Sequence, residues 1–212
     1  MKEYKNSLTT QTADVLNSFS EIDELKNFTL VGGSALSIHL MHRLSEDLDF
    51  FTWFEKLETA GTDSIIKQIS KKLQVKILNT YSGGIDLLID KVKVTCFANN
   101  WEKLKEREPL YNNSFIGKLE LLTAMKVNSL SLRAKFRDYY DLYVIVKEVF
   151  DIKKVLDISL AYVPGMTKKI FYMQLPYVQD IDDETIEHLK PKYKITLEEM
   201  QTFFEREIKK IL

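Results

Sequence analysis

The sequence predicts an α+β protein in which a small mixed sheet with packed helices is followed by an all-helical region. In the first hundred residues, segments of helical period alternate with short strand-like runs, the pattern of a sheet covered by helices. From residue 115 onward nearly every segment has helical spacing. Between them, residues 98–113 hold two asparagine pairs, a run of charges and Pro109, which indicates a linker or crossover. We therefore expect two domains, residues 1–100 and 101–212.

The N-terminal elements are assigned from the spacing of apolar side chains. The predicted helices span residues 8–26, 34–41 and 62–73. The predicted strands span residues 28–31, 47–51, 75–78, 84–89 and 92–97. The last of these runs alternates apolar and polar residues, and the last two flank Asp90 and Lys91, which predicts a β-hairpin turning at that pair.

The C-terminal elements are helices separated by prolines at residues 164, 176 and 191. They are predicted over residues 118–130, 136–150, 152–162, 168–175, 181–189 and 197–212. This half contains no strand-like alternation, so we expect an all-helical domain.

The composition is that of an ordinary soluble protein, with 45% hydrophobic and 29% charged residues and a net charge of −1. There is no apolar run near 18 residues, and the first residues lack the apolar core of a signal peptide, so we expect a cytoplasmic protein with no membrane association. The single cysteine, Cys96, excludes an internal disulfide and is expected to be a small core residue. One cysteine and three scattered histidines also argue against a zinc site.

The most informative segment is 31–51, which opens with a Gly-Gly-Ser turn at residues 32–34 and closes with Asp47-Leu48-Asp49. Strand alternation places Asp47 and Asp49 on one side, about 7 Å apart for a rise of ~3.4 Å per residue. Oxygen ligands of this kind suit Mg²⁺, and a turn that opens a helix can cradle a phosphate. The alternative is an ordinary turn beside solvated carboxylates. Because two desolvated carboxylates need a counter-charge, we favour a metal-dependent enzyme that acts on a nucleotide.

Two blocks of residues carry a resemblance to a known family. The first consists of residues 32–36 (GGSAL), His42-Arg43, Ser45 and 47–51 (DLDFF). The second consists of Lys126 on one predicted helix and residues 137–142 (RDYYDL) on the next. The order of a Gly-Ser turn, a helix and a strand bearing Asp-x-Asp resembles the nucleotidyltransferase superfamily. More narrowly, the two blocks together resemble the AbiEii-type nucleotidyltransferase toxins of type IV toxin–antitoxin systems.

This resemblance implies a role for each matched residue in the N-terminal block. Asp47 and Asp49 would hold the Mg²⁺ that binds a nucleoside triphosphate (NTP). Gly33 and Ser34 would cradle its β- and γ-phosphates, and Arg43 would contact the nucleotide.

The C-terminal block would supply Lys126 as a phosphate-neutralising cation and Asp138 as a base or ligand. Asp141 would contribute to nucleotide binding, although an ion pair with Arg137 four residues earlier is an equally good explanation of it.

By the same resemblance, the protein would transfer a nucleoside monophosphate from an NTP to RNA, such as a tRNA 3′ end. It would act as the toxin of a toxin–antitoxin or phage-defence system, with a cognate antitoxin protein as partner. Two other functions remain open: a nucleotide-binding regulatory module without turnover, and a transferase that acts on a small molecule or a protein hydroxyl.

One position departs from the superfamily pattern. Nucleotidyltransferases commonly bring a third carboxylate from the strand beside Asp-x-Asp, where this sequence has Thr95. If the hairpin turns at residues 90–91, Asp86 lies opposite Thr95 on the same face. Asp86 could then supply the missing carboxylate, but we expect it to be an ordinary surface residue.

Overall fold

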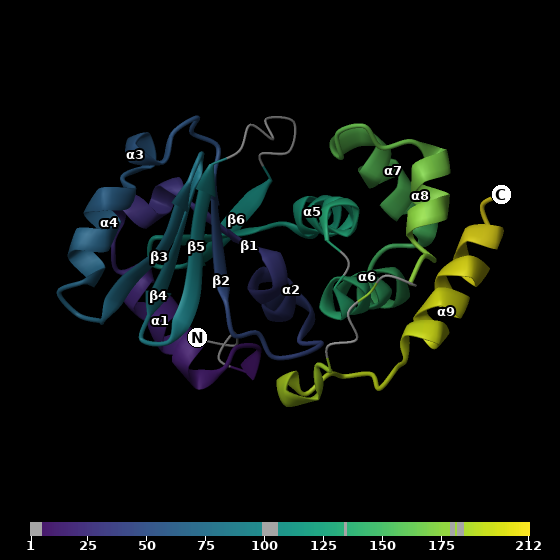
Figure 1. Cartoon of the computed structure of the whole chain (residues 1–212), viewed down its shortest axis with the longest axis horizontal. Helices are drawn as coiled ribbons and strands as arrows, with labels where there is room; N and C mark the ends of the chain where they lie inside the picture. Colours follow the sequence, from purple (N-terminus) through teal and green to yellow (C-terminus); the bar gives the residue numbers. More distant parts are fainter. Residues whose placement is uncertain (1–5, 99–105, 134, 179–180, 182–184) are drawn as a thin grey trace. The chain divides into compact units, whose positions relative to one another are not determined.

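The structure is a computed structural model that describes residues 6–98, 106–133, 135–178, 181 and 185–212 (Figure 1). The chain divides into two compact units, Met1–Leu119 and Glu120–Leu212. The boundary predicted from the sequence, between residues 100 and 101, lies outside the described residues. None of the described helices is long and apolar enough to cross a membrane.

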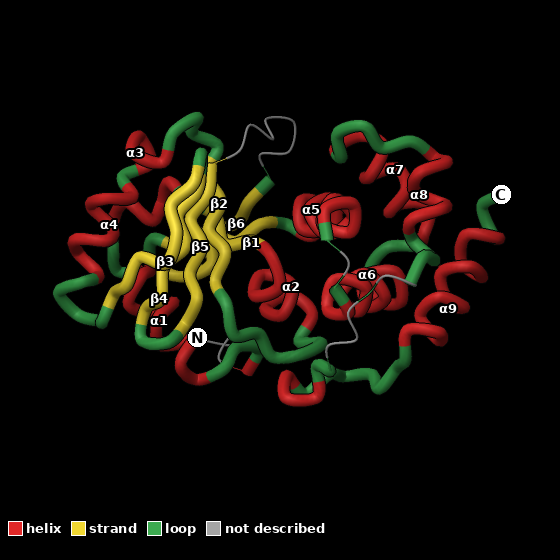
Figure 2. Tube along the Cα trace, in the orientation of Figure 1, coloured by secondary structure: helices red, strands yellow, loops and turns green. Residues whose placement is uncertain are grey.

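The first unit is built on a sheet whose described strands follow the order β3-β4-β5-β2-β1-β7-β6 (Figure 2, strands in yellow). Their bounds are β1 Thr29–Val31, β2 Leu48–Thr52, β3 Val75–Tyr81, β4 Gly84–Ile89, β5 Val92–Ala98, β6 Arg107–Tyr111 and β7 Ser114–Gly117. The pairs β2–β5 and β1–β7 are parallel, and the other neighbouring pairs are antiparallel. The predicted small mixed sheet is therefore confirmed, and so is the hairpin formed by β4 and β5.

The prediction of a linker over residues 98–113 is wrong for its described part. Residues 107–111 form β6, which pairs with β7 at the edge of the sheet. Pro109 disguises this strand in the sequence because proline lacks the N–H of a central strand, yet an edge strand tolerates it. Residues 99–105 lie outside the described part of the chain.

The helices of the first unit are α1 Thr10–Ser20, α2 Gly32–Leu40, α3 Leu57–Ala60 and α4 Thr62–Ile69, with a 3-10 helix, η2, at Asp23–Asn27. The predicted helix over 8–26 is therefore interrupted, because Ile22 is extended between α1 and η2. In the core, Phe19 of α1 stacks on Phe50 of β2 with ring centroids 5.5 Å apart. This contact anchors the strand that carries the Asp-x-Asp motif.

The second unit is helical in its described residues, whereas β6 and β7, which lie within the range 101–212 predicted to be all-helical, belong to the sheet of the first unit. Its elements are α5 Leu119–Leu132, which begins at the unit boundary, α6 Phe136–Glu148, α7 Ile152–Tyr162, α8 Lys168–Gln174, the 3-10 helix η4 Glu187–Leu189 and α9 Leu197–Lys209. The predicted helix over 181–189 is reduced, in its described part, to η4. Lys190 has a φ of 51°, outside the right-handed helical region, and it precedes Pro191, a context that disfavours helix.

Candidate active site

The Gly-Gly turn holds a carboxylate against the start of a helix. Gly32, with a φ of 69°, opens α2 directly after β1. Antiparallel pairing of β1 with β2 sets Val31 opposite Asp49. A Cβ added at Gly32 would lie 2.4 Å from Asp49 Oδ2, so only glycine permits this approach. The Asp49 carboxylate therefore lies beside the N-terminus of α2, where the helix dipole favours negative charge.

A buried guanidinium lies beside the same turn. A Cβ added at Gly33 would lie 2.6 Å from Arg43 Nη2, so Arg43 packs directly against the Gly33 backbone. Arg43 is only 4% exposed, and its Nη1 donates to the Leu44 carbonyl at 2.9 Å. The turn thus places a fixed carboxylate and a fixed cation next to two successive glycines, an arrangement suited to a metal-bound phosphate.

Ser34 has a different position from the one expected. Its hydroxyl is buried and donates to the backbone carbonyl of Asp47, so it fastens the start of the Asp-x-Asp segment to α2. We expected this hydroxyl to face a phosphate. Because the hydroxyl proton is already used, donation to a phosphate falls to the backbone N–H groups of the turn.

The predicted opposition of Asp86 and Thr95 is confirmed by the sheet register. Thr95 pairs with Asp86 on β4 and with Asp49 on β2, which sets the three residues in one row across the sheet. Thr95 Oγ1 donates to Asp86 Oδ1 at 2.8 Å, and Lys93 Nζ lies 3.7 Å from Asp86 Oδ2. The Asp86 side chain is 19% exposed and paired, so the expectation of an ordinary surface carboxylate is wrong.

Thr95 nonetheless lies between Asp49 and Asp86 in this row, so the two carboxylates are not on neighbouring strands. Among the described residues, no group of three or more histidine, cysteine, aspartate or glutamate side chains is arranged to hold a metal ion. A metal at Asp47 and Asp49 would therefore take its remaining ligands from water and substrate phosphates, as Mg²⁺ commonly does.

The second block of motif residues forms a buried ion network between α5 and α6. Lys126 Nζ lies 2.7 Å from Asp138 Oδ1 and 2.7 Å from Asp141 Oδ2. Arg133 Nε lies 3.2 Å from Asp138 Oδ2. Both carboxylates are fully buried and Lys126 is 6% exposed. Lys126 is therefore not a solvated lysine, and it is an ion-pair partner of Asp141.

Arg133 is the member of this network that the sequence does not single out. In the sequence, the signal for Arg133 is its position five residues before Asp138, in the short connection between α5 and α6. Its side chain is 54% exposed, so it supplies charge to Asp138 from the solvent side of the network.

His39 does not have the environment of a catalyst. Its Nε2 lies 2.9 Å from the Gly117 carbonyl of β7, so the ring links α2 to the sheet. This contact explains the histidine without a chemical role.

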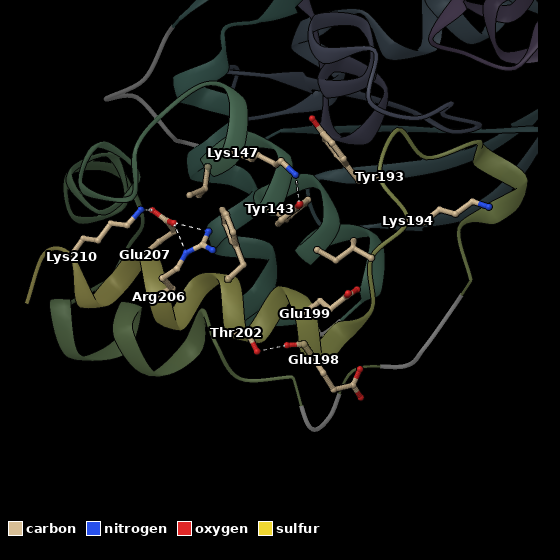
Figure 3. Close-up of a pocket in the computed structure, with 13 residues that line it drawn as sticks. Tyr143, Lys147, Tyr193, Lys194, Glu198, Glu199, Thr202, Arg206, Glu207 and Lys210 are labelled. Carbon is tan, nitrogen blue, oxygen red and sulfur yellow. Dashed lines mark hydrogen bonds and ion pairs between the residues drawn. The ribbon is translucent and has the colours of Figure 1, made fainter.

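A cavity of about 810 Å³ lies in the helical unit between α6 and α9, and none of the residues that line it belongs to the two motif blocks (Figure 3). Its charged side chains are largely used within the protein. Arg206 and Lys210 pair with Glu207 at 3.0 Å and 2.5 Å. Lys147 donates to the Tyr143 hydroxyl at 2.6 Å and lies 3.8 Å above the Tyr193 ring. We therefore place the candidate active site at the Gly-Gly turn and the Asp-x-Asp strand.

Comparison with known proteins gives a family match to the part of the chain that contains these residues. Residues 14–93, which include the turn and both aspartates, match the family model described as nucleotidyl transferase AbiEii toxin, type IV TA system. The uncharacterized protein aq_aa25 of Aquifex aeolicus (strain VF5) is 29% identical over 209 residues, covering 97% of this chain and 98% of that protein.

Two solved structures share the fold across most of the chain. JHP933 from Helicobacter pylori is 16% identical with a TM-score of 0.54, covering 97% of this chain and 96% of its own. MenT4, a nucleotidyltransferase toxin from Mycobacterium tuberculosis H37Rv, is 11% identical with a TM-score of 0.60, covering 92% of this chain and 80% of its own.

The family model that matches residues 14–93 describes a nucleotidyltransferase, and this span contains the turn–helix–strand site. Over this span, the match confirms the resemblance of the motifs to the AbiEii-type toxins of type IV toxin–antitoxin systems. This match implies an NTP as substrate and an antitoxin as the toxin's counterpart.

Proposed function

We propose that this protein is a Mg²⁺-dependent enzyme that transfers a nucleoside monophosphate from an NTP to an acceptor. The observation that carries the proposal is the Asp49 carboxylate packed against Gly32 at the N-terminus of α2. An Mg²⁺ held by Asp49 would bring its bound phosphates next to the helix-terminal N–H groups, as nucleotidyl transfer requires.

The residues at this place fit Mg²⁺ in their chemistry. Asp47 and Asp49 are hard oxygen ligands, and the bond from Ser34 to the Asp47 carbonyl fixes the backbone between them. Bound there, the ion would neutralise phosphate charge and polarise the phosphoryl group under attack. Arg43, held against Gly33, is the nearest fixed cation for the remaining phosphate charge.

Lys126 and Asp138 have complementary roles in this proposal. In the described structure they neutralise each other, and Asp141 holds Lys126 from a second side. We propose that a phosphate of the substrate competes for the Lys126 ammonium. Asp138 would then be released to accept the proton of the attacking hydroxyl, while Asp141 keeps the lysine in position.

The acceptor we propose is RNA, such as a tRNA 3′ end, and the consequence is growth arrest when the antitoxin is absent. Support comes from the AbiEii toxin match rather than from the geometry. The alternative function is nucleotide binding without turnover. It is favoured by Thr95, which occupies a position where nucleotidyltransferases commonly have a third carboxylate and whose hydroxyl donates a hydrogen bond to Asp86.

The test is to incubate the protein with Mg²⁺, each α-³²P-labelled NTP in turn, and either total tRNA or cell lysate. The proposal predicts label on RNA, and no transfer by Asp49→Ala. Label on protein or on a small molecule would contradict the proposed acceptor, whereas tight NTP binding without any transferred label would favour the regulatory module.

A further inference from the structure

The accessible face of the sheet carries two parallel rows of side chains beside the candidate active site. Residues directly opposite each other in neighbouring strands share a face, so the register defines the rows. The polar row is Asp49, Thr95, Asp86 and Asn79, and the next row is Phe51, Phe97, Gly84 and Tyr81. The second row is aromatic except at Gly84.

The other face of the same strands is the core of the unit. Its members are all buried: Leu48, Phe50, Ile85, Leu87, Val94 and Cys96. On the accessible face, by contrast, Phe97 and Thr95 are half-buried, and Tyr81 is 45% exposed. Large apolar area therefore remains available next to the carboxylate row.

Gly84 gives the Tyr81 ring its position. A Cβ added at Gly84 would lie 2.1 Å from Tyr81 Cε2 and 2.4 Å from its hydroxyl oxygen. The outer end of the ring thus lies directly over the backbone of β4, which no other residue at position 84 would allow. Tyr81 is thereby turned inward from the sheet edge, toward Phe97 on β5.

The electrostatic field of the carboxylate row reaches this ring. Partial burial raises the pKa of the Tyr81 hydroxyl, and the charges of Asp86 and then Asp49 raise this pKa further. At neutral pH the ring is an uncharged aromatic surface beside the carboxylates. The Tyr81 ring lies over β4, which is two strand spacings of ~4.8 Å, or roughly 10 Å, from β2, so a base near the ring and a phosphate near Asp49 are separated on the scale of one nucleotide.

We propose that Tyr81, with Phe97 beside it, is a stacking platform for a nucleobase whose phosphate is held at Asp47 and Asp49. This inference rests on the proposed function and extends it to base binding. Stacking on an aromatic face accepts every base, because each base has a π-face. The base belongs either to the bound NTP or to the 3′-terminal nucleotide of the acceptor.

A purely structural explanation must be distinguished from this one. An aromatic ring placed over a cross-strand glycine also shields the exposed backbone and stabilises the strand pair. That role predicts an effect of Tyr81 on stability, but it predicts no difference between ligands that carry a base and ligands that do not.

The experiment is calorimetric titration of the full chain and its Tyr81→Ala and Tyr81→Phe variants in Mg²⁺. The probes are the four NTPs, inorganic tripolyphosphate, and an RNA oligonucleotide ending in CCA. Tyr111→Ala is the matched control, because Tyr111 is a 37% exposed tyrosine on β6, at the other edge of the same sheet. Unfolding in denaturant is measured for each variant.

We expect Tyr81→Ala to weaken binding of a base-carrying probe about tenfold or more, the scale of one lost stacking contact. Tripolyphosphate binding should not change, and Tyr81→Phe and Tyr111→Ala should bind like the wild type. Loss confined to NTPs would assign the platform to the donor base, and loss confined to RNA would assign it to the acceptor.

Unchanged affinity for every probe would overturn the inference, and so would an equal loss for tripolyphosphate and NTPs. If the wild-type protein bound no NTP at all, the proposed function itself would fail. That result is distinguishable from a failure at Tyr81.

Discussion

At the scale of single residues, two adjacent glycines allow charged side chains to pack directly against the turn of the candidate active site. Gly32 has a positive φ and lies in contact with the Asp49 carboxylate, and Gly33 lies in contact with Arg43. The sequence predicts the turn, since Gly-Gly-Ser after an apolar run is a strong turn signal. It does not predict the contacts, because they depend on which residue of β2 faces Val31.

Gly32→Ala should abolish most of the transfer activity. The added Cβ would displace Asp49 Oδ2, and the left-handed backbone adds strain of about 1–2 kcal/mol. Gly165→Ala is the matched control, because Gly165 also has a positive φ, at 72°, but no atom lies within 4 Å of its Cβ position. Both variants should lose similar stability in denaturant titrations. We expect transfer to fall on the order of 10²-fold for Gly32→Ala alone, and equal activity of the two variants would refute the Asp49 contact.

The thiol of Cys96 should be unreactive in the folded protein. Burial raises its pKa to about 12, and the nearby Asp49 and Asp86 charges act in the same direction. The reactive thiolate is therefore scarce at pH 8, whereas the unfolded chain, with an ordinary thiol pKa, reacts readily. Modification by Ellman's reagent should be slow in buffer and rapid in denaturant. Because Cys96 is the only cysteine, fast modification in buffer would show that β5 is not packed as described.

At the scale of elements, the two motif blocks differ in how much the sequence shows. The hairpin of β4 and β5 follows from two strand-like runs around Asp90 and Lys91, which both have the positive φ of a tight turn. Strand β6 is missed because Pro109 and flanking charges resemble a linker. The burial of Lys126 is missed because its ion-pair partners come from the next helix, and a single lysine on an amphipathic helix gives no sign of them.

Lys126→Ala should destabilise the helical unit as well as reduce turnover. Its removal leaves the fully buried Asp138 and Asp141 without the ammonium they share, a change that typically costs about 3–5 kcal/mol. Urea titration should show this loss, and Lys126→Arg, which keeps the charge, should recover part of it.

The catalytic role of Lys126 needs a separate readout. In the folded fraction, we expect Lys126→Ala to lower kcat more than NTP affinity, because charge on the leaving pyrophosphate develops during the reaction. Loss of stability with kcat unchanged would limit Lys126 to a structural role.

At the scale of the whole molecule, the fold is shared with proteins that have little sequence in common with it. MenT4 is 11% identical yet covers 92% of the chain at a TM-score of 0.60, while the AbiEii family model covers residues 14–93. The motif residues in that region were therefore sufficient to predict the class. For the helical unit, the sequence predicted the helices and, through the family resemblance, roles for Lys126 and Asp138, but not their buried ion network, because that network is assembled by packing.

The central claim is that Asp47 and Asp49 hold the metal at which nucleotidyl transfer occurs. The most direct measurement is label transfer from α-³²P-NTPs to total tRNA by Asp47→Ala and Asp49→Ala, with unfolding transitions recorded in parallel. We predict that each variant loses Mg²⁺-dependent transfer while remaining folded, and that stability without metal is equal or higher because two neighbouring acids no longer repel each other. Near wild-type transfer by a folded Asp49→Ala variant would contradict the account.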